Sequence, residues 1–310
     1  IIAFRLGLIR GKRSVGVSDV GNKFVQTLQE IALSSSSIES EVEFSSIPAG
    51  YSFSEEHMPF GPSAAIESMD IGSVPWNHDL EKTYYDVDLK ASEAIMDLYR
   101  RGIPFSTIQK ALSTGAMGLQ RGRKLVPTRW SITACDTTIG DQLLSDVRQC
   151  STIDCWRVHE FDSLNNHYAV LLMPTAWQYE WIEAFLHVMG REELIFSDHE
   201  GHRPKKEYSS VGGCYYSCKL AVLEALEREQ KQAGAIVLRE ASQGYVPLGV
   251  FNVRENVRHA MLQPGIEFED AGSALGYLSQ KFSLPLSRFK EESHLLKTST
   301  RQRQATLGEF

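Results

Sequence analysis

The stretch CWRVHEFDSLNNHYAVLLM, from Cys155 to Met173, decides the fold class of this chain. Two runs rich in aromatic, β-branched and other apolar residues, Cys155 to Phe161 and His167 to Met173, flank the polar cluster Asp162-Ser163-Leu164-Asn165-Asn166. Strand-forming runs that are separated by a short group of turn-forming residues are typical of a β-hairpin. We therefore expect a hairpin at the centre of the chain, with one strand in each run.

Other strands and helices are expected on both sides of this hairpin. A second strand pair is predicted at residues 235–239 and 245–251, where Pro247 indicates an edge strand or a bulge because proline has no N–H to donate. Apolar residues three or four positions apart predict helices. These helices are expected at residues 88–102 with Asp88 as N-cap, 106–113, 137–149 with Asp136 or Thr137 as N-cap, 177–189, 207–232, 253–262 and 270–282.

Together these elements predict a mixed α/β (α+β) fold, in which an antiparallel or mixed sheet of hairpins packs with helices. A chain of 310 residues is long enough for two domains. We expect a loop-rich and helical N-terminal domain at residues 1–150, in which residues 34–87 are mostly loops with short strands. A mixed α/β C-terminal domain is expected at residues 151–293, followed by a flexible tail at residues 294–310.

The composition limits the class of protein. Hydrophobic residues make up 42% and charged residues 23% of the chain, as in globular proteins, and the net charge of −7 predicts that any contact with DNA is local. The longest apolar run, near residues 168–174, has the length of a strand, so no membrane span is expected. Five cysteines without a secretory signal indicate a cytoplasmic protein with free thiols. Because the chain begins at Ile1 and not at Met, we expect further residues before it.

The last seven residues, QATLGEF, form a candidate docking peptide. Gln304, Leu307 and Phe310 have the spacing Q-x-x-L-x-x-F of peptides that bind the replication sliding clamp, PCNA. In a single 3₁₀ turn, Leu307 and Phe310 lie on one side and can enter one hydrophobic pocket, while Gln304 reaches polar groups. Complete motifs of this kind carry a second aromatic residue, which is missing here. The sequence therefore predicts clamp binding of reduced affinity through Gln304, Leu307 and Phe310.

Several longer segments resemble the archaeal Nre family of DNA-repair proteins. They are KLVPTRWSITA at residues 124–134, DLKASEA at residues 88–94, residues 206–216 with KEY, GG and YY, VPLGV at residues 246–250 and VRENVR at residues 253–258. The resemblance implies a role in DNA repair inside the cell, at the nucleoid, with DNA, the sliding clamp and other repair proteins as partners. Members of the family usually begin with a cysteine-rich, zinc-finger-like segment, which this sequence does not contain.

Candidate DNA-binding residues occur in three places. Arg121, Arg123, Lys124 and Arg129 lie within ten positions of one another, next to Trp130, and can bind phosphates while the indole stacks on a base. The alternative is a solvated loop with Trp130 in the core. Lys205 and Lys206 form a second basic pair. Arg254 and Arg258 are one helical turn apart and can face one anion, although a surface ion-pair network with Glu255 is an equally simple interpretation.

Metal binding has weak support in the sequence. Asp198, His199 and Glu207 lie in one polar segment, but they match no standard metal-ligand spacing. The family resemblance implies two adjacent acids after the RWS segment, where this chain has Asp136 followed by Thr137. Cys214 and Cys218 share the apolar face of their helix and are expected in the core. We assign no metal and no zinc to these residues, and a divalent cation stays a weak alternative at Asp136, Asp198, His199 and Glu207.

The sequence thus favours a DNA-repair factor that the sliding clamp recruits and that binds damaged or branched DNA through a local basic surface. Two alternatives remain open. The first is an enzyme, either a metal-dependent nuclease or an abasic-site lyase in which Lys205 or Lys206 attacks the sugar aldehyde. The second is a non-enzymatic scaffold for other repair proteins. Motifs for ATP binding and serine hydrolysis are missing from the sequence.

Overall fold

The computed structural model describes residues 6–54, 57–188, 190, 192–203 and 205–298. The chain divides into two compact units. Unit 1 comprises residues Ile1–Ile139 together with Pro247–Gly249, and unit 2 comprises Gly140–Val246 and Val250–Phe310. Among the helices of the described ranges, none is long and apolar enough to cross a membrane.

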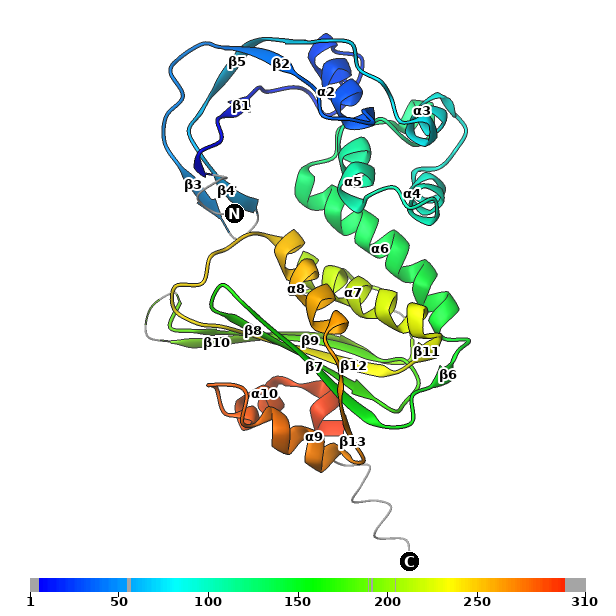
Figure 1. The fold of residues 1–310 in the computed structure, drawn as a ribbon, viewed down its shortest axis with the longest axis vertical. Helices are drawn as coiled ribbons and strands as arrows, with labels where there is room; N and C mark the ends of the chain where they lie inside the picture. Colours follow the sequence, from blue (N-terminus) through cyan, green and yellow to red (C-terminus); the bar gives the residue numbers. More distant parts are fainter. Residues whose placement is uncertain (1–5, 55–56, 189, 191, 204, 299–310) are drawn as a thin grey trace, which may run out of the picture. The chain divides into compact units, whose positions relative to one another are not determined.

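Unit 1 combines short strands with helices, as Figure 1 shows in blue to green. Its three-stranded sheet has the order β1-β5-β2, and a second pair of strands, β3 and β4, is antiparallel. The bounds of these strands are β1 Arg10–Lys12, β2 Ser40–Phe44, β3 Ser52–Ser54, β4 His57–Phe60 and β5 Ser63–Ile71. The short strands within residues 34–87 confirm the expectation for that segment, which additionally contains α3.

Helices α2 and α3 of unit 1 begin at asparagine caps. Asn22 accepts a hydrogen bond from Phe24 N at the start of α2, and Asn77 accepts two at the start of α3. Asp88 does not cap the predicted helix at 88–102, because Lys90 is the N-cap and its own N–H donates to the Glu93 carboxylate. The bounds are α2 Lys23–Leu33, α3 His78–Tyr85, α4 Ala91–Arg100, α5 Phe105–Ser113, the 3₁₀ turn η1 Gln120–Gly122 and α6 Thr128–Val147.

Helix α6 starts nine residues earlier than the prediction at residue 137. Pro127 directly precedes Thr128, and proline is well tolerated at a helix start because it has no N–H that needs a partner. Asp136 therefore lies inside the helix, where it is buried, and it does not cap the helix start. The apolar and small residues on the buried face of this first half, Ser131, Cys135 and Ile139, are spaced four apart.

The described residues of unit 2 form a six-stranded sheet of order β10-β9-β12-β8-β7-β13, which confirms the predicted mixed α/β class. The predicted hairpin is present as β7 and β8, joined by Leu164 and Asn165 at positive φ, the conformation that two-residue hairpin turns require. The bounds are β7 Trp156–Ser163, β8 Asn166–Met173, β9 Tyr179–Leu186, β10 Glu193–Glu200, β12 Gly234–Ala241 and β13 Ile266–Phe268, with a separate parallel pair of β6 Ser151–Thr152 and β11 Lys231–Gln232.

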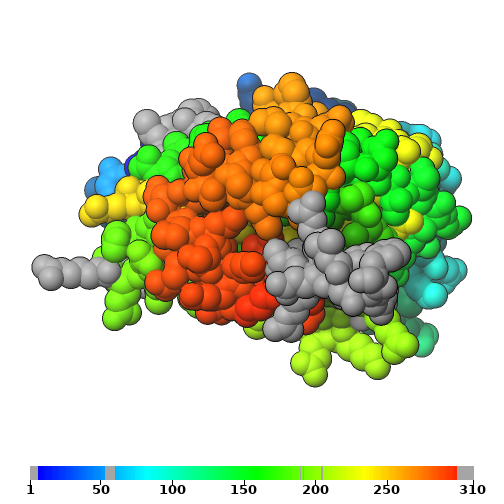
Figure 2. Space-filling model, turned by 90° about the horizontal axis from the view of Figure 1, so that it is seen from below, coloured from blue at the N-terminus to red at the C-terminus, as the bar shows by residue number. Residues whose placement is uncertain are grey.

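Helices cover both faces of this sheet (Figure 1). Helices α7 Gly213–Glu229 and α8 Val250–Leu262 lie on one face, and α9 Ala271–Leu278 and α10 Leu286–Glu292 lie on the other. Asp270 accepts hydrogen bonds from Gly272 N and Ser273 N, which confirms the expected start of α9. Figure 2 shows the layer of α9 and α10, in orange and red, from its outer side. The sheet is therefore buried on both faces, and β8 and β12 are almost entirely buried.

The predicted helix at residues 177–189 was wrong, because residues Tyr179–Leu186 form strand β9. This strand lies between β10 and β12, and seven of its eight residues are buried, including Glu180 and Glu183. A strand that is covered on both faces loses the alternation of apolar and polar residues. Glu180 and Glu183 are three positions apart, which is the spacing of polar residues on one face of a helix, and this spacing favoured the wrong prediction.

The predicted strand at residues 245–251 was also wrong. Its expected partner, β12, pairs with β8 on one side and β9 on the other, so both of its edges are already occupied. Residues 242–249 instead form a connection in which Gly249 adopts a positive φ, and α8 begins at Val250. Helix α7 likewise begins at Gly213, later than the predicted residue 207.

The folded part extends beyond residue 294, where we expected the tail to begin. Leu295 and Leu296 are buried in the core between the sheet and α9 and α10. These two residues therefore belong to the folded part, although the sequence placed them in a tail. The clamp-binding peptide with Gln304, Leu307 and Phe310 lies outside the described residues.

Candidate nucleic acid interface

The basic segment of unit 1, residues 121–130, carries five of the predicted DNA-binding residues. Arg121, Lys124 and Arg129 are exposed, whereas Arg123 is half-buried. Arg121 and Lys124 form no ion pair with any side chain in the described ranges. Two cations that are not neutralised by neighbouring carboxylates are suited to bind phosphate.

Arg123 fixes the conformation of this segment. Its Nε donates to the carbonyl of Gly118 over 2.9 Å, and its Nη2 donates to the carbonyl of Asp86 over 3.1 Å. The guanidinium also lies 5.3 Å from the centre of the Tyr84 ring. Burial lowers the pKa of Arg123, with opposing contributions from Tyr84 and Asp86. Arg123 thus joins the basic segment to the end of α3 and keeps its positive charge beside a cavity.

The lining of that cavity combines cationic and apolar side chains. Its volume is about 400 Å³, and Lys90, Arg123 and Lys124 contribute its charged atoms. Lys90 was missed in the sequence because it lies more than thirty positions before the basic segment, although it belongs to the DLKASEA run that resembles the Nre family. The apolar side chains of the cavity are Ala91, Leu112, Met117, Leu119 and Val126.

Trp130 is on the surface, so the alternative in which this residue lies in the core is wrong. The residue is 45% exposed, and the guanidinium of Arg129 lies 5.2 Å from the centre of its ring. The early start of α6 explains this position, because the buried face of the helix passes through Ser131, one position further along. An exposed indole beside a guanidinium is suited to stack on an unpaired base.

Lys205 and Lys206 in unit 2 have different environments. Lys205 donates to Asp198 over 2.6 Å, whereas Lys206 is exposed. The same carboxylate accepts hydrogen bonds from Ser209 Oγ over 2.6 Å and from Ser210 N over 3.1 Å. Asp198 therefore holds the segment that leads into α7, and Lys205 is committed to an ion pair.

This arrangement predicts how acid affects the segment before α7. Burial raises the pKa of Asp198, but hydrogen bonds from Lys205 and Ser209 outweigh burial and leave the pKa below its ordinary value. A lowered carboxyl pKa adds stability above the pKa of the unfolded chain, and that stability is lost as the pH falls through the folded pKa. The stability difference between the wild type and Asp198→Asn should thus be on the order of 1–3 kcal/mol at pH 7. It should shrink below about pH 4.

Hydrogen exchange of residues 205–212 at several pH values measures this difference. The variant Asp154→Asn is a suitable control, since Asp154 is an exposed carboxylate of unit 2. A stability difference for Asp198→Asn that does not change between pH 7 and pH 3.5 would contradict the proposed role of the charge.

Arg254 and Arg258 do not form an exposed anion site. Arg254 is fully buried, with its guanidinium 5.3 Å from the centre of the Phe251 ring. Arg258 binds both carboxylate oxygens of Glu224 over 2.7 Å and Glu255 over 2.8 Å. The ion-pair network with Glu255 that we considered as the alternative is therefore what the structure contains. Neither arginine is positioned to receive an external phosphate.

The weak metal candidates have different environments. Asp136 is buried in α6, Asp198 forms an ion pair with Lys205, and Glu207 is exposed. Within the described ranges, no three His, Cys, Asp or Glu side chains are arranged to hold a metal ion. Cys218 is buried, as expected, and Cys214 is half-buried.

Comparison with known families identifies the chain. The family model described as "Archaeal Nre, N-terminal" matches residues 1–188, and "Archaeal Nre, C-terminal" matches residues 200–310. DNA repair protein NreB of Archaeoglobus fulgidus is 39% identical, with the match covering 100% of this chain and 79% of the relative. No solved structure matches this chain.

Two further relatives give the same result. DNA repair protein NreA of Archaeoglobus fulgidus is 34% identical, covering 91% of this chain and 73% of the relative. DNA repair protein NreA of Haloferax volcanii is 32% identical, covering 92% of this chain and 70% of the relative. Each half of the chain matches its own Nre model, and each of these relatives is named a DNA repair protein. The chain therefore belongs to the archaeal Nre family.

Proposed function

We propose that this protein is a DNA-repair factor that binds damaged or branched DNA through the basic segment of unit 1 and is brought to DNA by the sliding clamp. The observation that carries the DNA-binding part is the exposed Trp130 with the Arg129 guanidinium 5.2 Å from its ring centre. The relatives named DNA repair proteins support the role, and the Q-x-x-L-x-x-F spacing of Gln304, Leu307 and Phe310 supports recruitment.

The basic segment supplies the two interactions that unpaired DNA requires. Arg121, Lys124 and Arg129 attract phosphates, and Trp130 offers a flat surface on which a base stacks. Bases in intact duplex are already stacked on one another, so the indole distinguishes strands with unpaired bases from intact duplex. The net charge of −7 keeps the rest of the surface from binding DNA strongly.

Binding is proposed in preference to cleavage because the basic segment of unit 1 combines exposed cations with an exposed indole. Incubation of labelled damaged DNA with Mg²⁺, Mn²⁺ or EDTA tests this preference. Metal-dependent cleavage would support the nuclease hypothesis instead. Trapping of a borohydride-reduced lysine adduct on abasic DNA would support the lyase hypothesis.

The triple variant Arg121→Ala/Lys124→Ala/Arg129→Ala should lose most of its DNA binding. Each lost phosphate contact should reduce the slope of log K against log salt by about one. The fluorescence anisotropy of labelled DNA, measured across a series of salt concentrations, gives both the affinity and this slope. Trp130→Ala should weaken binding to DNA with unpaired bases by about 1–3 kcal/mol and should affect intact duplex much less.

A control variant that loses the same number of positive charges shows whether the position of the cations matters or only the total charge. Arg228→Ala/Arg288→Ala/Lys290→Ala removes three exposed cations from unit 2 and should leave the affinity and the salt slope close to those of the wild type. If the two triple variants lose the same affinity, the basic segment is not the binding surface. If the wild type shows no salt-dependent binding at all, the scaffold hypothesis is favoured.

A further inference from the structure

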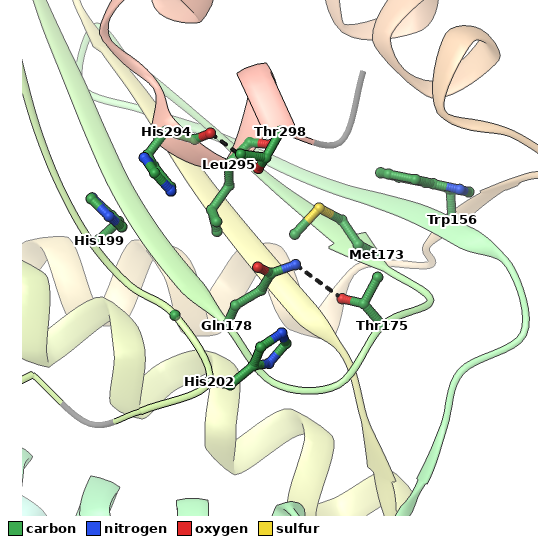
Figure 3. A pocket seen from close by; sticks show the side chains of 10 residues that line it. Trp156, Met173, Thr175, Gln178, His199, His202, His294, Leu295 and Thr298 are labelled. Carbon is green, nitrogen blue, oxygen red and sulfur yellow. Dashed lines mark hydrogen bonds between the residues drawn. The ribbon is translucent and has the colours of Figure 1, made fainter. Parts of the chain in front are cut away.

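A second cavity lies in unit 2, and its lining includes none of the residues that the sequence proposed for DNA. It has a volume of about 350 Å³ and lies where β8 ends, β9 begins and β10 ends, beside the helical turn at residues 294–298. Figure 3 shows His199 and His294 together on one side, Trp156 on the other, and Gln178 between them. Pockets of this size hold ligands of about the size of a nucleoside.

The floor of this cavity is shaped by a missing side chain. A Cβ atom at Gly234, the first residue of β12, would lie 2.5 Å from Thr175 Oγ1, 2.8 Å from Met173 Cε and 3.1 Å from Gln178 Cγ. Three lining residues therefore occupy the space that the side chain of any residue other than glycine at position 234 would need. Gly234 lets the Gln178 side chain lie across the floor with its amide directed into the cavity (Figure 3).

One wall of the cavity is fixed by a buried carboxylate. Glu180 accepts hydrogen bonds from His294 N over 2.7 Å and from Leu295 N over 2.9 Å, and Ser293 Oγ donates to it as well. Burial raises the pKa of Glu180, and these three donors act against that effect. The contacts hold His294 so that its ring stacks on His199, with ring centres 4.1 Å apart and an angle of 7° between the planes. The wall is thus preorganised.

The described lining of the cavity includes three histidines, His199, His202 and His294, and no Asp, Glu, Lys or Arg. Burial lowers the pKa of His199, His294 lowers it further, and Asp198 acts against both. Trp156, Met173 and Leu295 supply apolar surface. A phosphate or carboxylate would meet no fixed positive charge here, whereas a neutral planar ring would be covered on its faces.

Gln178 supplies the directional contact. Its amide Nε2 donates to Thr175 Oγ1 over a long 3.3 Å, which leaves the amide able to exchange this hydrogen bond for one to a ligand. A carboxamide offers two donors and an acceptor side by side, the pattern that complements the edge of a nucleobase. The amide therefore favours ligands that have a donor and an acceptor on the same edge.

From this geometry we infer that the cavity binds a nucleobase, with the ring faces covered by the His199–His294 stack and Trp156 and the edge held by the Gln178 amide. The base enters either as a free nucleoside or as a nucleotide extruded from a DNA strand, and both present the same chemistry. This site is separate from the basic segment and does not depend on the function proposed for that segment.

Binding of adenosine, guanosine, cytidine and thymidine, measured by saturation-transfer NMR and calorimetry, tests the inference. At least one nucleoside should bind, and deoxyribose 5-phosphate should bind at least tenfold more weakly. The Gln178→Leu variant should bind that nucleoside at least tenfold more weakly than the wild type. The control Gln280→Leu changes an exposed glutamine in unit 2 and should have no effect. His294→Ala removes one stacked ring but keeps the backbone N–H that Glu180 binds, and it should weaken binding without unfolding the protein.

Duplexes that carry 2-aminopurine opposite a mismatch distinguish the two sources. A fluorescence change that Gln178→Leu abolishes indicates an extruded base, and nucleoside binding without that change indicates a free nucleoside. The inference is overturned if neither probe binds, if deoxyribose 5-phosphate binds as well as the nucleosides, or if Gln178→Leu and His294→Ala bind like the wild type.

Discussion

Replacing Arg239 by methionine is expected to lower the stability of unit 2 by about 3–5 kcal/mol, since removing one partner of a buried ion pair leaves the other charge uncompensated. Arg239 is buried in β12, and its Nη1 donates to Glu183 over 2.9 Å. Its Nε and Nη2 donate to Asn166 Oδ1 over 3.0 and 2.7 Å. The ring centres of Phe185, Tyr245 and Tyr168 lie 5.3, 5.4 and 5.8 Å from the guanidinium. Methionine has a similar length but replaces none of these hydrogen bonds.

Hydrogen exchange of β8 and β12 measures this loss of stability within unit 2. A global unfolding curve is less suitable, because it would combine the unfolding of both units. Exchange in these strands should accelerate by about a hundredfold or more, since 1.4 kcal/mol corresponds to a factor of ten. The double variant Arg239→Met/Glu183→Gln removes both charges and should recover part of the loss. A change of less than 1 kcal/mol for Arg239→Met, or a double variant that is worse than the sum of both single variants, would contradict this account.

Deleting residues 304–310 is expected to abolish co-elution of the protein with the sliding clamp in size-exclusion chromatography. The motif places Leu307 and Phe310 on one side of a single turn, and the loss of two anchors that fill one hydrophobic pocket should weaken binding by at least a hundredfold. Leu307→Ala/Phe310→Ala should have the same effect. A tail of the same composition in scrambled order is the matched control, because it keeps the length and charge but not the spacing.

A second aromatic residue after the first completes motifs of this kind, and this gives the proposal a test of gain. Adding a tyrosine after Phe310 should strengthen clamp binding by about tenfold, or ~1.4 kcal/mol. The deletion should leave the DNA affinity of the basic segment unchanged, since that segment belongs to unit 1. Unchanged co-elution after the deletion would disprove recruitment through the tail and leave the DNA-binding proposal standing.

The sequence by itself determined the elements whose pattern is local. The β7–β8 hairpin followed from two strand-forming runs around a turn cluster, and its turn residues Leu164 and Asn165 have the required positive φ. The start of α9 followed from Asp270, whose carboxylate caps two N–H groups of the first turn. Membership of the Nre family also followed from the sequence, since it rests on runs of residues and not on their position in space.

Tertiary structure alone decided strand β9 and the inclusion of residues 294–298 in the folded part. Strand β9 has no alternating pattern because both of its faces are covered. Its buried Glu180 accepts hydrogen bonds from the Ser293 hydroxyl and from the backbone N–H groups of His294 and Leu295, the first two residues of the expected tail. Such a carboxylate is indistinguishable in sequence from a surface glutamate. Leu295 and Leu296 are buried only because the sheet and α10 are present to receive them.

The candidate sites divide in the same way. Sequence spacing brought Arg121, Lys124 and Arg129 together because they are neighbours in the chain, but it could not decide whether Trp130 faces solvent, since that depends on where α6 begins. The nucleobase cavity draws Trp156, Gln178, His199 and His294 from four separate segments, which no spacing rule connects. Arg254 and Arg258 had the spacing of an anion site, and only the packed Glu224 and Glu255 carboxylates showed that their charge is neutralised within the fold.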